Sequence, residues 1–469
     1  MPAIEQSRKY LVLAICCSSL FLVSLDGTIV NVALPAISEE LHSNVSTLQW
    51  TVDAYLLVLA SLLLLSGSVA DRIGRKKVFA VGVAIFSLGS LLCSLAPTDG
   101  WLIGFRMFQA VGGSAMTPVA LAIVTNIFVA PAERARAIGL WAAVSGIGIA
   151  AGPLIGGFLV DGLGWRLIFW INVPTGIAAT ILTLFFVPES KAKERRNLDP
   201  VGQGTVVVFL AALVFAIIEA PRFGLLSPSI LAASGLAAAS LAFLLVYERR
   251  RDDALVPLPV FHVRSFSTSF SIAVLGFAAF GGLLFANTLY LQQVRGLPAS
   301  LAGILTLPLA VATVVAAPLS GRLLSRIGAR LPLLIAGATM TAGALLLIVL
   351  TPSAPVGLLT VPYAIFGVGY GMLNAPINDT AVSDLPDDRA GVGASLISTS
   401  KQVGSALGVA VAGAILVAAP GGSLADAFAS HSWLVWSVIA ACGAAILVLA
   451  IRPVTAEGSD HGSAVPQRV

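Results

Sequence analysis

The chain carries little charge. Asp, Glu, Lys and Arg make up 11% of its 469 residues, while 57% are hydrophobic and the mean hydropathy is +0.95. Soluble domains carry about 25% charged residues, so the composition excludes a soluble enzyme or binding module. The net charge of +4 follows from basic loops and gives no reason to expect a nucleic-acid partner. We expect an all-α polytopic membrane protein.

Residues that form disulfides or bind metals are scarce. The four cysteines all lie in apolar segments, which predicts packing and no disulfide framework; they are Cys16, Cys17, Cys93 and Cys442. The four histidines form no ligand-spaced cluster; they are His42, His262, His431 and His461. We therefore expect no metal site and no cofactor.

A nucleotide-driven pump is also excluded. The sequence has no Gly-x-x-x-x-Gly-Lys-Ser/Thr loop and no hydrophilic segment long enough for a nucleotide-binding domain. Energy for any transport must come from an ion gradient or from the substrate's own gradient. No small-residue cleavage site follows the first apolar run, so we expect it to be a retained helix.

Long apolar runs are what the chain has in abundance. A membrane span needs about 20 apolar residues, and fourteen segments meet that length. They are 10–35, 48–68, 78–96, 101–127, 137–160, 167–187, 201–220, 228–247, 266–290, 300–321, 331–350, 356–378, 391–419 and 431–451.

A short polar stretch, 67–77, separates the second and third spans. Its four basic residues place it on the cytoplasmic side by the positive-inside rule; they are Arg72, Arg75, Lys76 and Lys77. Of the 27 Lys and Arg, only three then fall in outer loops, which are Arg166, Arg222 and Arg295. We expect both termini in the cytoplasm. A simpler interpretation is that this stretch only sets the topology.

The stretch recurs later in the chain. Residues 321–330 keep its glycine spacing and one arginine, with Ser325 where Asp71 stood. Such repeats relate the two halves of many transporters, with the substrate site between them. We expect six-helix halves at 1–190 and 265–451, two inserted helices within 191–264, and a disordered cytoplasmic tail at 452–469.

Two opposite charges lie inside the predicted spans. Asp26 precedes Pro35 by about 13 Å of helix, and a carboxylate at that depth costs at least about 2.5 kcal/mol. Arg106 shares a helical stripe with Gln109 and Gly113. Because each charge needs a partner in lipid, we expect Asp26 and Arg106 to interact. A purely structural ion pair, or a static clamp by Arg106, remains the alternative.

A second carboxylate, Asp53, shares one helix face with Trp50. A ring beside a carboxylate can hold a cation, so both are candidates for a substrate site. The alternative is an interfacial tryptophan next to an acid at headgroup level. The roles of Glu219 and Asp379 stay open, and Lys401 is expected to extend toward the inner surface.

The fifth span has a face without side chains. Gly148, Gly152 and Gly156 recur every four residues, so a neighbouring helix can approach closely. Pro153 removes a backbone donor and favours a bend, and Gly157 completes a Gly-Pro-x-x-Gly-Gly sequence.

These motifs resemble those of a known family. The 67–77 stretch looks like the signature between helices 2 and 3 of the major facilitator superfamily; its matching residues are Gly67, Asp71, Arg72, Gly74, Arg75 and Lys76. The Gly-Pro motif resembles the antiporter motif of the family's exporters. Together they resemble the fourteen-helix branch of the drug:proton antiporters, most densely over 25–176. The resemblance implies that Asp26, Asp53 and Arg106 couple transport to protons.

From this resemblance we expect an exporter of hydrophobic, cationic drugs or antibiotics, acting as a monomer in the cell membrane. Protonation of Asp26 or Asp53 would compete with the substrate's charge. The alternative is proton-coupled uptake of a small nutrient, which the Gly-Pro motif argues against; a membrane receptor would not need buried acids. The sequence does not identify the compound.

The polar stretch also suggests a gate. We expect Asp71 to dock against the start of the helix near Gly391 when the inner side closes, because a helix N-terminus attracts a carboxylate. Arg72, Arg75 and Lys76 would then pair with neighbouring acids. The competing interpretation is that Asp71 is satisfied within its own loop.

Overall fold

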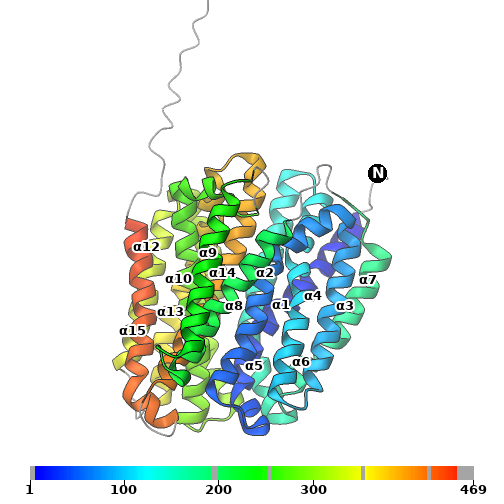
Figure 1. Cartoon of the computed structure of the whole chain (residues 1–469). Helices are drawn as coiled ribbons and strands as arrows, with labels where there is room; N and C mark the ends of the chain where they lie inside the picture. Colours follow the sequence, from blue (N-terminus) through cyan, green and yellow to red (C-terminus); the bar gives the residue numbers. More distant parts are fainter. Residues whose placement is uncertain (1–5, 192–198, 252–254, 350–353, 420–423, 452–469) are drawn as a thin grey trace, which may run out of the picture.

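The computed structural model describes residues 6–191, 199–251, 255–349, 354–419 and 424–451. The tail expected at 452–469 lies outside the described residues. Within the described ranges, fourteen helices are long and apolar enough to cross a membrane, which confirms the predicted number of spans. Figure 1 shows them as one bundle of roughly parallel rods.

The helices follow one another with short connections. The first six spans are α1 (Gln6–Leu41), α2 (Val45–Ile73), α3 (Arg75–Ser94), α4 (Asp99–Ile127), α5 (Pro131–Leu163), and a broken span made of α6 (Leu167–Trp170) and α7 (Asn172–Phe186). The next two are α8 (Pro200–Phe223) and α9 (Pro228–Glu248). The last six are α10 (Arg264–Leu289) with its π-helical extension η2 (Tyr290–Val294), α11 (Ala299–Ile327), α12 (Arg330–Val349), α13 (Thr360–Ser383), α14 (Asp387–Val417) and α15 (Leu424–Ile451). Short 3-10 turns precede α10 and α13, namely η1 (Leu258–His262) and η3 (Val356–Leu359).

Two boundaries differ from the sequence expectation. The first helix continues through Pro35 to Leu41. A membrane helix tolerates the backbone hydrogen bond that proline cannot make, because neighbouring groups satisfy the freed carbonyl. The sixth span is broken at Ile171, between α6 and α7. Pro174 lies in the first turn of α7, where its missing N–H is not needed.

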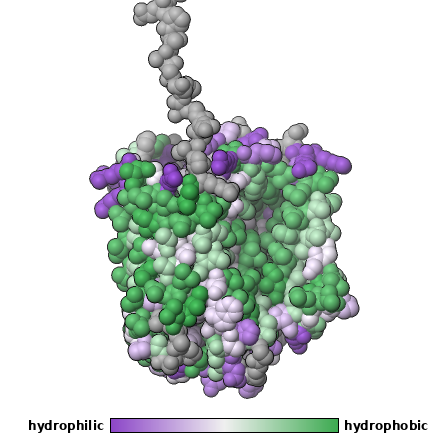
Figure 2. All heavy atoms as spheres, turned by 90° about the vertical axis from the view of Figure 1, so that its left-hand side faces the viewer, coloured by the Kyte–Doolittle hydropathy of each residue, from purple (hydrophilic) through white to green (hydrophobic). Residues whose placement is uncertain are grey.

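The helices form two groups with the pair α8–α9 between them. In Figure 1, α1 to α7 lie on one side and α10 to α15 on the other, with α8 and α9 in front of the boundary. Within the groups, α1 packs on α5 and α3 on α4, as α10 packs on α14 and α11 on α13. Figure 2 shows a hydrophobic belt between two hydrophilic ends, as expected of a chain that spans a bilayer.

The sequence repeat is visible in the backbone. The α2–α3 turn is made by Gly74, with φ of 133°, and the α11–α12 turn by Gly328, with φ of 81°. Residues other than glycine rarely adopt this left-handed conformation. We call the end of the bundle that holds the α2–α3 turn the basic end, and the opposite end the far end.

The two groups meet at the far end. Gln49 of α2 donates from Nε2 to the carbonyl oxygens of Val409 (3.2 Å) and Ala410 (2.8 Å) of α14. Gln292 of η2 donates to the carbonyl of Val32 in α1 at 2.9 Å. Toward the basic end, by contrast, most residues of 132–147 in α5 and 391–402 in α14 are exposed or partly exposed. The bundle is closed at the far end and parted at the basic end.

The helix pair between the groups contacts both of them. α8 packs against α2 of the first group and α14 of the second. Gln203 of α8 donates to the carbonyl of Ser61 in α2, and Glu219 near the other end of α8 accepts from Trp50 of α2 at 3.0 Å. These two bonds hold α8 along the length of α2.

Candidate functional site

The centre of the first group holds a buried ion pair. Asp26 of α1 and Arg106 of α4 are 0% and 1% exposed, and Arg106 Nη1 lies 2.5 Å from Asp26 Oδ2. The guanidinium carbon is 4.0 Å from the centroid of the Tyr55 ring of α2. The predicted interaction of Asp26 with Arg106 is confirmed, and it joins three helices.

Neutral side chains complete this cluster. Gln109 Nε2 donates to Asp26 Oδ1 at 2.9 Å and to Ser90 Oγ at 2.6 Å. Asn172 Nδ2 donates to the same Asp26 oxygen at 3.2 Å. Both carboxylate oxygens therefore have donors, which offsets the burial of the charge. Gln109 was expected here from the stripe on its helix, whereas Ser90 and Asn172 were not.

Asp53 has different surroundings. It is 0% exposed, and neither carboxylate oxygen has a hydrogen-bond partner in the described part of the chain. It lies one helical turn from Gln49, within the closed far-end part of α2. A buried carboxylate without a partner is costly, which sets Asp53 apart from Asp26.

Trp50 has its hydrogen-bond partner on α8. Its indole N–H donates to Glu219 Oε1 at 3.0 Å, and Arg222 lies 3.9 Å from the other Glu219 oxygen. Trp50 thus fixes α2 to α8 in this conformation. Glu219, whose role the sequence left open, is 7% exposed and belongs to this contact.

The loop at the basic end is satisfied internally. Arg75 donates from Nε (3.1 Å) and Nη2 (3.0 Å) to Asp71 Oδ1. Its Nη1 reaches the carbonyl of Ala122 in α4 at 3.4 Å. In this conformation, with the basic end parted, Asp71 pairs with Arg75 of its own loop, as the competing interpretation expects. The expected docking of Asp71 against α14 belongs to the conformation in which the basic end is closed, and it stays a prediction.

A residue that sequence reasoning missed supports this loop. Glu189, just after α7, accepts from the backbone N–H of Lys76 at 3.1 Å and so caps the start of α3, where a carboxylate is favourable. A Cβ on Gly74 would lie 2.6–2.8 Å from the Glu189 carboxyl group. The φ of Gly74 is what requires glycine at this turn, since the end of the Glu189 side chain could shift away from a Cβ. The only signal in the sequence is an acid directly after an apolar span.

The glycine face of α5 packs on α1. A Cβ on Gly148 would lie 2.9 Å from Ser24 Cβ, and one on Gly156 would lie 2.7 Å from Ile29 Cγ1. Gly152 lies against Thr28, whose hydroxyl donates to the carbonyl of Ile149 in α5 at 3.2 Å. The predicted close approach of a neighbouring helix is confirmed, and the neighbour is α1.

The rest of the motif joins the two groups. Gly157 packs against the backbone of Ala299 in α11, and Gly303 of α11 packs against the carbonyl of Pro153. Asp161, one turn further on, accepts from the first two N–H groups of α11, those of Ala299 (3.0 Å) and Ser300 (2.8 Å). We call this contact the Asp161 latch. It closes the far end between α5 and α11.

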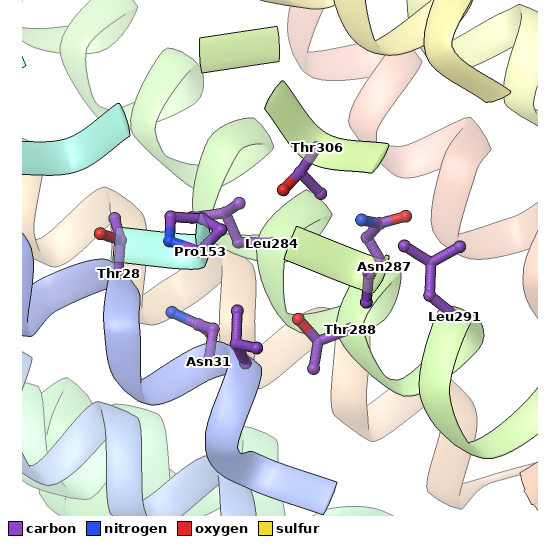
Figure 3. A pocket seen from close by; sticks show the side chains of 10 residues that line it. Thr28, Asn31, Pro153, Leu284, Asn287, Thr288, Leu291 and Thr306 are labelled. Atoms are coloured by element: carbon purple, nitrogen blue, oxygen red, sulfur yellow. The ribbon is translucent and has the colours of Figure 1, made fainter. Parts of the chain in front are cut away.

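A small polar space lies where the groups meet (Figure 3). It is lined by side chains of α1, α10 and α11 and by Pro153 of α5, with polar members Thr28, Asn31, Asn287, Thr288 and Thr306. Its volume of ≈ 10 Å³ is about what one water molecule requires. In this conformation the far-end part of the boundary is too tight for a drug-sized compound.

No group of three or more metal-binding side chains occurs among the residues that the structure describes.

Comparison with known proteins identifies the family. Residues 16–409 match the family described as Major Facilitator Superfamily. The multidrug resistance protein Stp of Mycobacterium tuberculosis is 37% identical over 85% of this chain and 74% of its own length. The tetracenomycin C resistance and export protein of Streptomyces glaucescens is 35% identical over 87% of this chain and 76% of its own length.

A solved structure agrees on the fold. An auto-inhibited POT family peptide transporter superposes with a TM-score of 0.69 at 15% identity, covering 98% of this chain and 99% of that one. The described chain has fourteen membrane-length helices, and relatives include drug efflux proteins. The chain belongs to the Major Facilitator Superfamily and is a multi-pass membrane transporter related to its drug efflux pumps.

Proposed function

We propose that the protein exports hydrophobic drugs or antibiotics in exchange for protons, by alternating access between its two halves. The halves are 1–190 and 265–451, with the inserted pair within 191–264. The basic end faces the cytoplasm, since most Lys and Arg lie there, and both termini are on that side. The closed far end then makes this conformation inward-facing.

The observation that carries proton coupling is the contrast between two buried acids. Asp26 is compensated by Arg106 and two amides, whereas Asp53 has no partner among the described residues. Asp53 lies in the part of α2 that the far end closes. Opening that end would expose it to water or to a cationic substrate. When the far end is open, Asp53 takes up a proton from outside as the substrate leaves. It gives this proton up to the cytoplasmic side once the basic end is open and the next substrate binds.

Export is favoured over nutrient uptake by two observations. The Gly-Pro motif of α5, which packs on α1 and α11, resembles the antiporter motif of the family's exporters. The relatives described above carry names of drug resistance and export. The exported compound is expected to be amphipathic, because the boundary between the halves mixes hydroxyl and amide groups with apolar side chains.

The test is a dye-efflux assay. Cells expressing the protein are loaded with ethidium, and its loss should be faster than from empty-vector cells. A protonophore should abolish the difference, because the proton gradient supplies the energy. Efflux that persists with the gradient collapsed contradicts proton exchange. Net ethidium accumulation that the gradient drives contradicts export. Growth protection against a panel of antibiotics then defines the substrate range. Light scattering of the purified protein tests the expected monomer, which should give a single peak at the monomer mass.

A further inference from the structure

A lysine lies deep in the second half. Lys401 is in α14, about 15 Å along the helix from Gly391, where the membrane-spanning part begins. A lysine at this depth costs about 2.5–3.5 kcal/mol and normally has a partner or faces water. Its surroundings therefore bear on function.

The partners of Lys401 are all uncharged. Nζ donates to Asn374 Oδ1 (3.1 Å) and Asn378 Oδ1 (3.0 Å) of α13, and it lies 5.6 Å from the centroid of the Phe277 ring of α10. In the described part of the chain, no carboxylate oxygen lies within 4.0 Å of Nζ. Unlike Arg106, which has Asp26, Lys401 has no acidic partner in the described part of the chain.

The side chains of this cluster reach the surface of the protein. Lys401, Asn374 and Phe277 are partly exposed, and Asn378 is exposed. Charged and amide groups in a span avoid hydrocarbon and face a cavity. The exposed part of α14 lies toward the basic end, where the two halves part.

A cluster of aromatic rings lies beside the ammonium group, with Phe277 as its partly exposed member. The Phe277 ring meets Tyr370 edge-on, with centroids 5.4 Å apart, and Phe280 stacks on the same tyrosine at 3.9 Å. The two asparagines present their oxygens to Lys401, which leaves their NH₂ groups as further donors. An ammonium has three donors, of which these amides take two.

We propose that Lys401, Asn374 and Asn378 recognise an anionic oxygen, a carboxylate or phenolate, on an aromatic substrate whose ring lies against Phe277. This inference rests on the proposed function and narrows its substrate class. A compound that also carries a cationic group satisfies the expectation from Asp53 as well, whereas a compound without an anionic oxygen, such as ethidium, makes no use of Lys401.

The competing explanation is that Lys401 only ties α14 to α13. A charge-matched pair of ligands separates the two explanations. We choose 2-naphthoate and 2-naphthamide, which share the ring and differ in the negative charge. Dissociation constants are measured by calorimetric titration of the purified full chain in nanodiscs at pH 7.5.

The wild type should bind naphthoate at least tenfold more tightly than naphthamide. Lys401→Gln should reduce this preference to twofold or less while leaving naphthamide affinity within twofold. Lys401→Arg should keep the preference, since it keeps the charge. The matched control is Lys77→Gln, at an exposed position in the first turn of α3, which should change nothing.

A second variant guards against a folding defect. Asn378→Asp keeps the contact with Lys401 and the size of the side chain but compensates the charge, so it should also abolish the preference. Equal binding of both ligands by the wild type overturns the proposal. So does an equal loss for both ligands in Lys401→Gln, or an unchanged preference in Asn378→Asp.

The result is separable from that of the dye assay. If ethidium efflux is not sensitive to the protonophore but the preference for naphthoate depends on Lys401, proton-driven export is contradicted and the proposed binding site still stands. Proton-driven efflux without the preference contradicts only the binding site.

Discussion

Two carboxylates of the first half are equally buried but have opposite surroundings. Asp26 has a guanidinium and two amide donors, whereas Asp53 has no partner in the described chain. A paired buried charge and a lone buried acid respond differently to substitution. The two therefore need different tests.

Removing either member of the Asp26–Arg106 ion pair should leave the other as a buried charge without a partner. We expect Asp26→Asn and Arg106→Gln each to reduce transport at least tenfold. Each should also destabilise the protein by about 3–5 kcal/mol, the usual result of leaving one buried charge alone. Thermal unfolding of purified protein and dye efflux from cells measure the two effects.

The double variant Asp26→Asn/Arg106→Gln is the control. It leaves no uncompensated charge, so we expect its stability to recover partly while transport stays low. Full transport in either single variant would show that the pair is dispensable.

For Asp53, the expected loss depends on the substrate's charge. Asp53→Asn keeps size and polarity and removes the charge, so resistance to cationic compounds should fall more than resistance to neutral ones, at unchanged expression. Growth protection with both kinds of compound measures this. Glu219→Gln is the matched control, because its amide oxygen can still accept from Trp50. Equal losses in Asp53→Asn would rule out charge recognition and favour a coupling or folding role.

At this scale, sequence reasoning found residues whose chemistry is unusual for their location. Asp26 and Arg106 were predictable as a pair because each is costly in lipid alone. Asn172 and Ser90 were not, because a neutral polar side chain in a span has many uses. Glu189 was missed because its partner, the start of α3, is more than 100 residues away.

At the scale of elements, α5 joins the halves through its far-end part. Its glycines bring it against α1 and α11, and the Asp161 latch adds a charge at the start of α11. The sequence predicted the bare helix face from its four-residue spacing. It did not predict the latch, because an acid near a helix end gives no indication of which other helix it meets.

Weakening the latch should favour opening of the far end. Asp161→Asn removes a charge that a helix N-terminus stabilises by about 0.3–1 kcal/mol, so the outward-facing population should rise severalfold. A Cys in place of Thr306, which lines the far-end space, should react faster with a membrane-impermeant maleimide added outside. Asp99→Asn, also near the far end but in the first turn of α4, is the control. An unchanged rate would show that the latch does not hold the closed state.

Asp71 should have the opposite effect. In the outward-facing state we expect it to leave Arg75 and dock at the start of α14, a contact worth about 0.3–2 kcal/mol. Asp71→Asn should therefore leave substrate affinity intact, slow turnover and favour the inward-facing state. A Cys in place of Ser398, in the parted half of α14, should then be labelled faster from the cytoplasmic side. Unchanged labelling would mean that the gate assignment is wrong.

At the scale of the whole molecule, span length was enough to predict fourteen helices, and the recurring glycine motif was enough to predict the repeat. Both are local properties, set by runs of about 20 residues and by a turn that needs glycine. The conformational state was not predictable. It depends on contacts such as the hydrogen bond from Gln49 to Ala410, which joins residues 361 positions apart. We expect such contacts to form in one conformation of a transporter and to break in the other.

The inserted pair gives the molecule two unequal flanks. α8 follows α2 along its length and also packs on α14, so it covers one of the two seams between the halves (Figure 1). Compounds that have partitioned into the inner leaflet meet a helical wall on this flank. On the flank formed by α5 and α11, where the basic-end stretch 132–147 is largely exposed, they meet the edge of the opening itself. We therefore expect any sideways entry from lipid to use the α5–α11 flank alone.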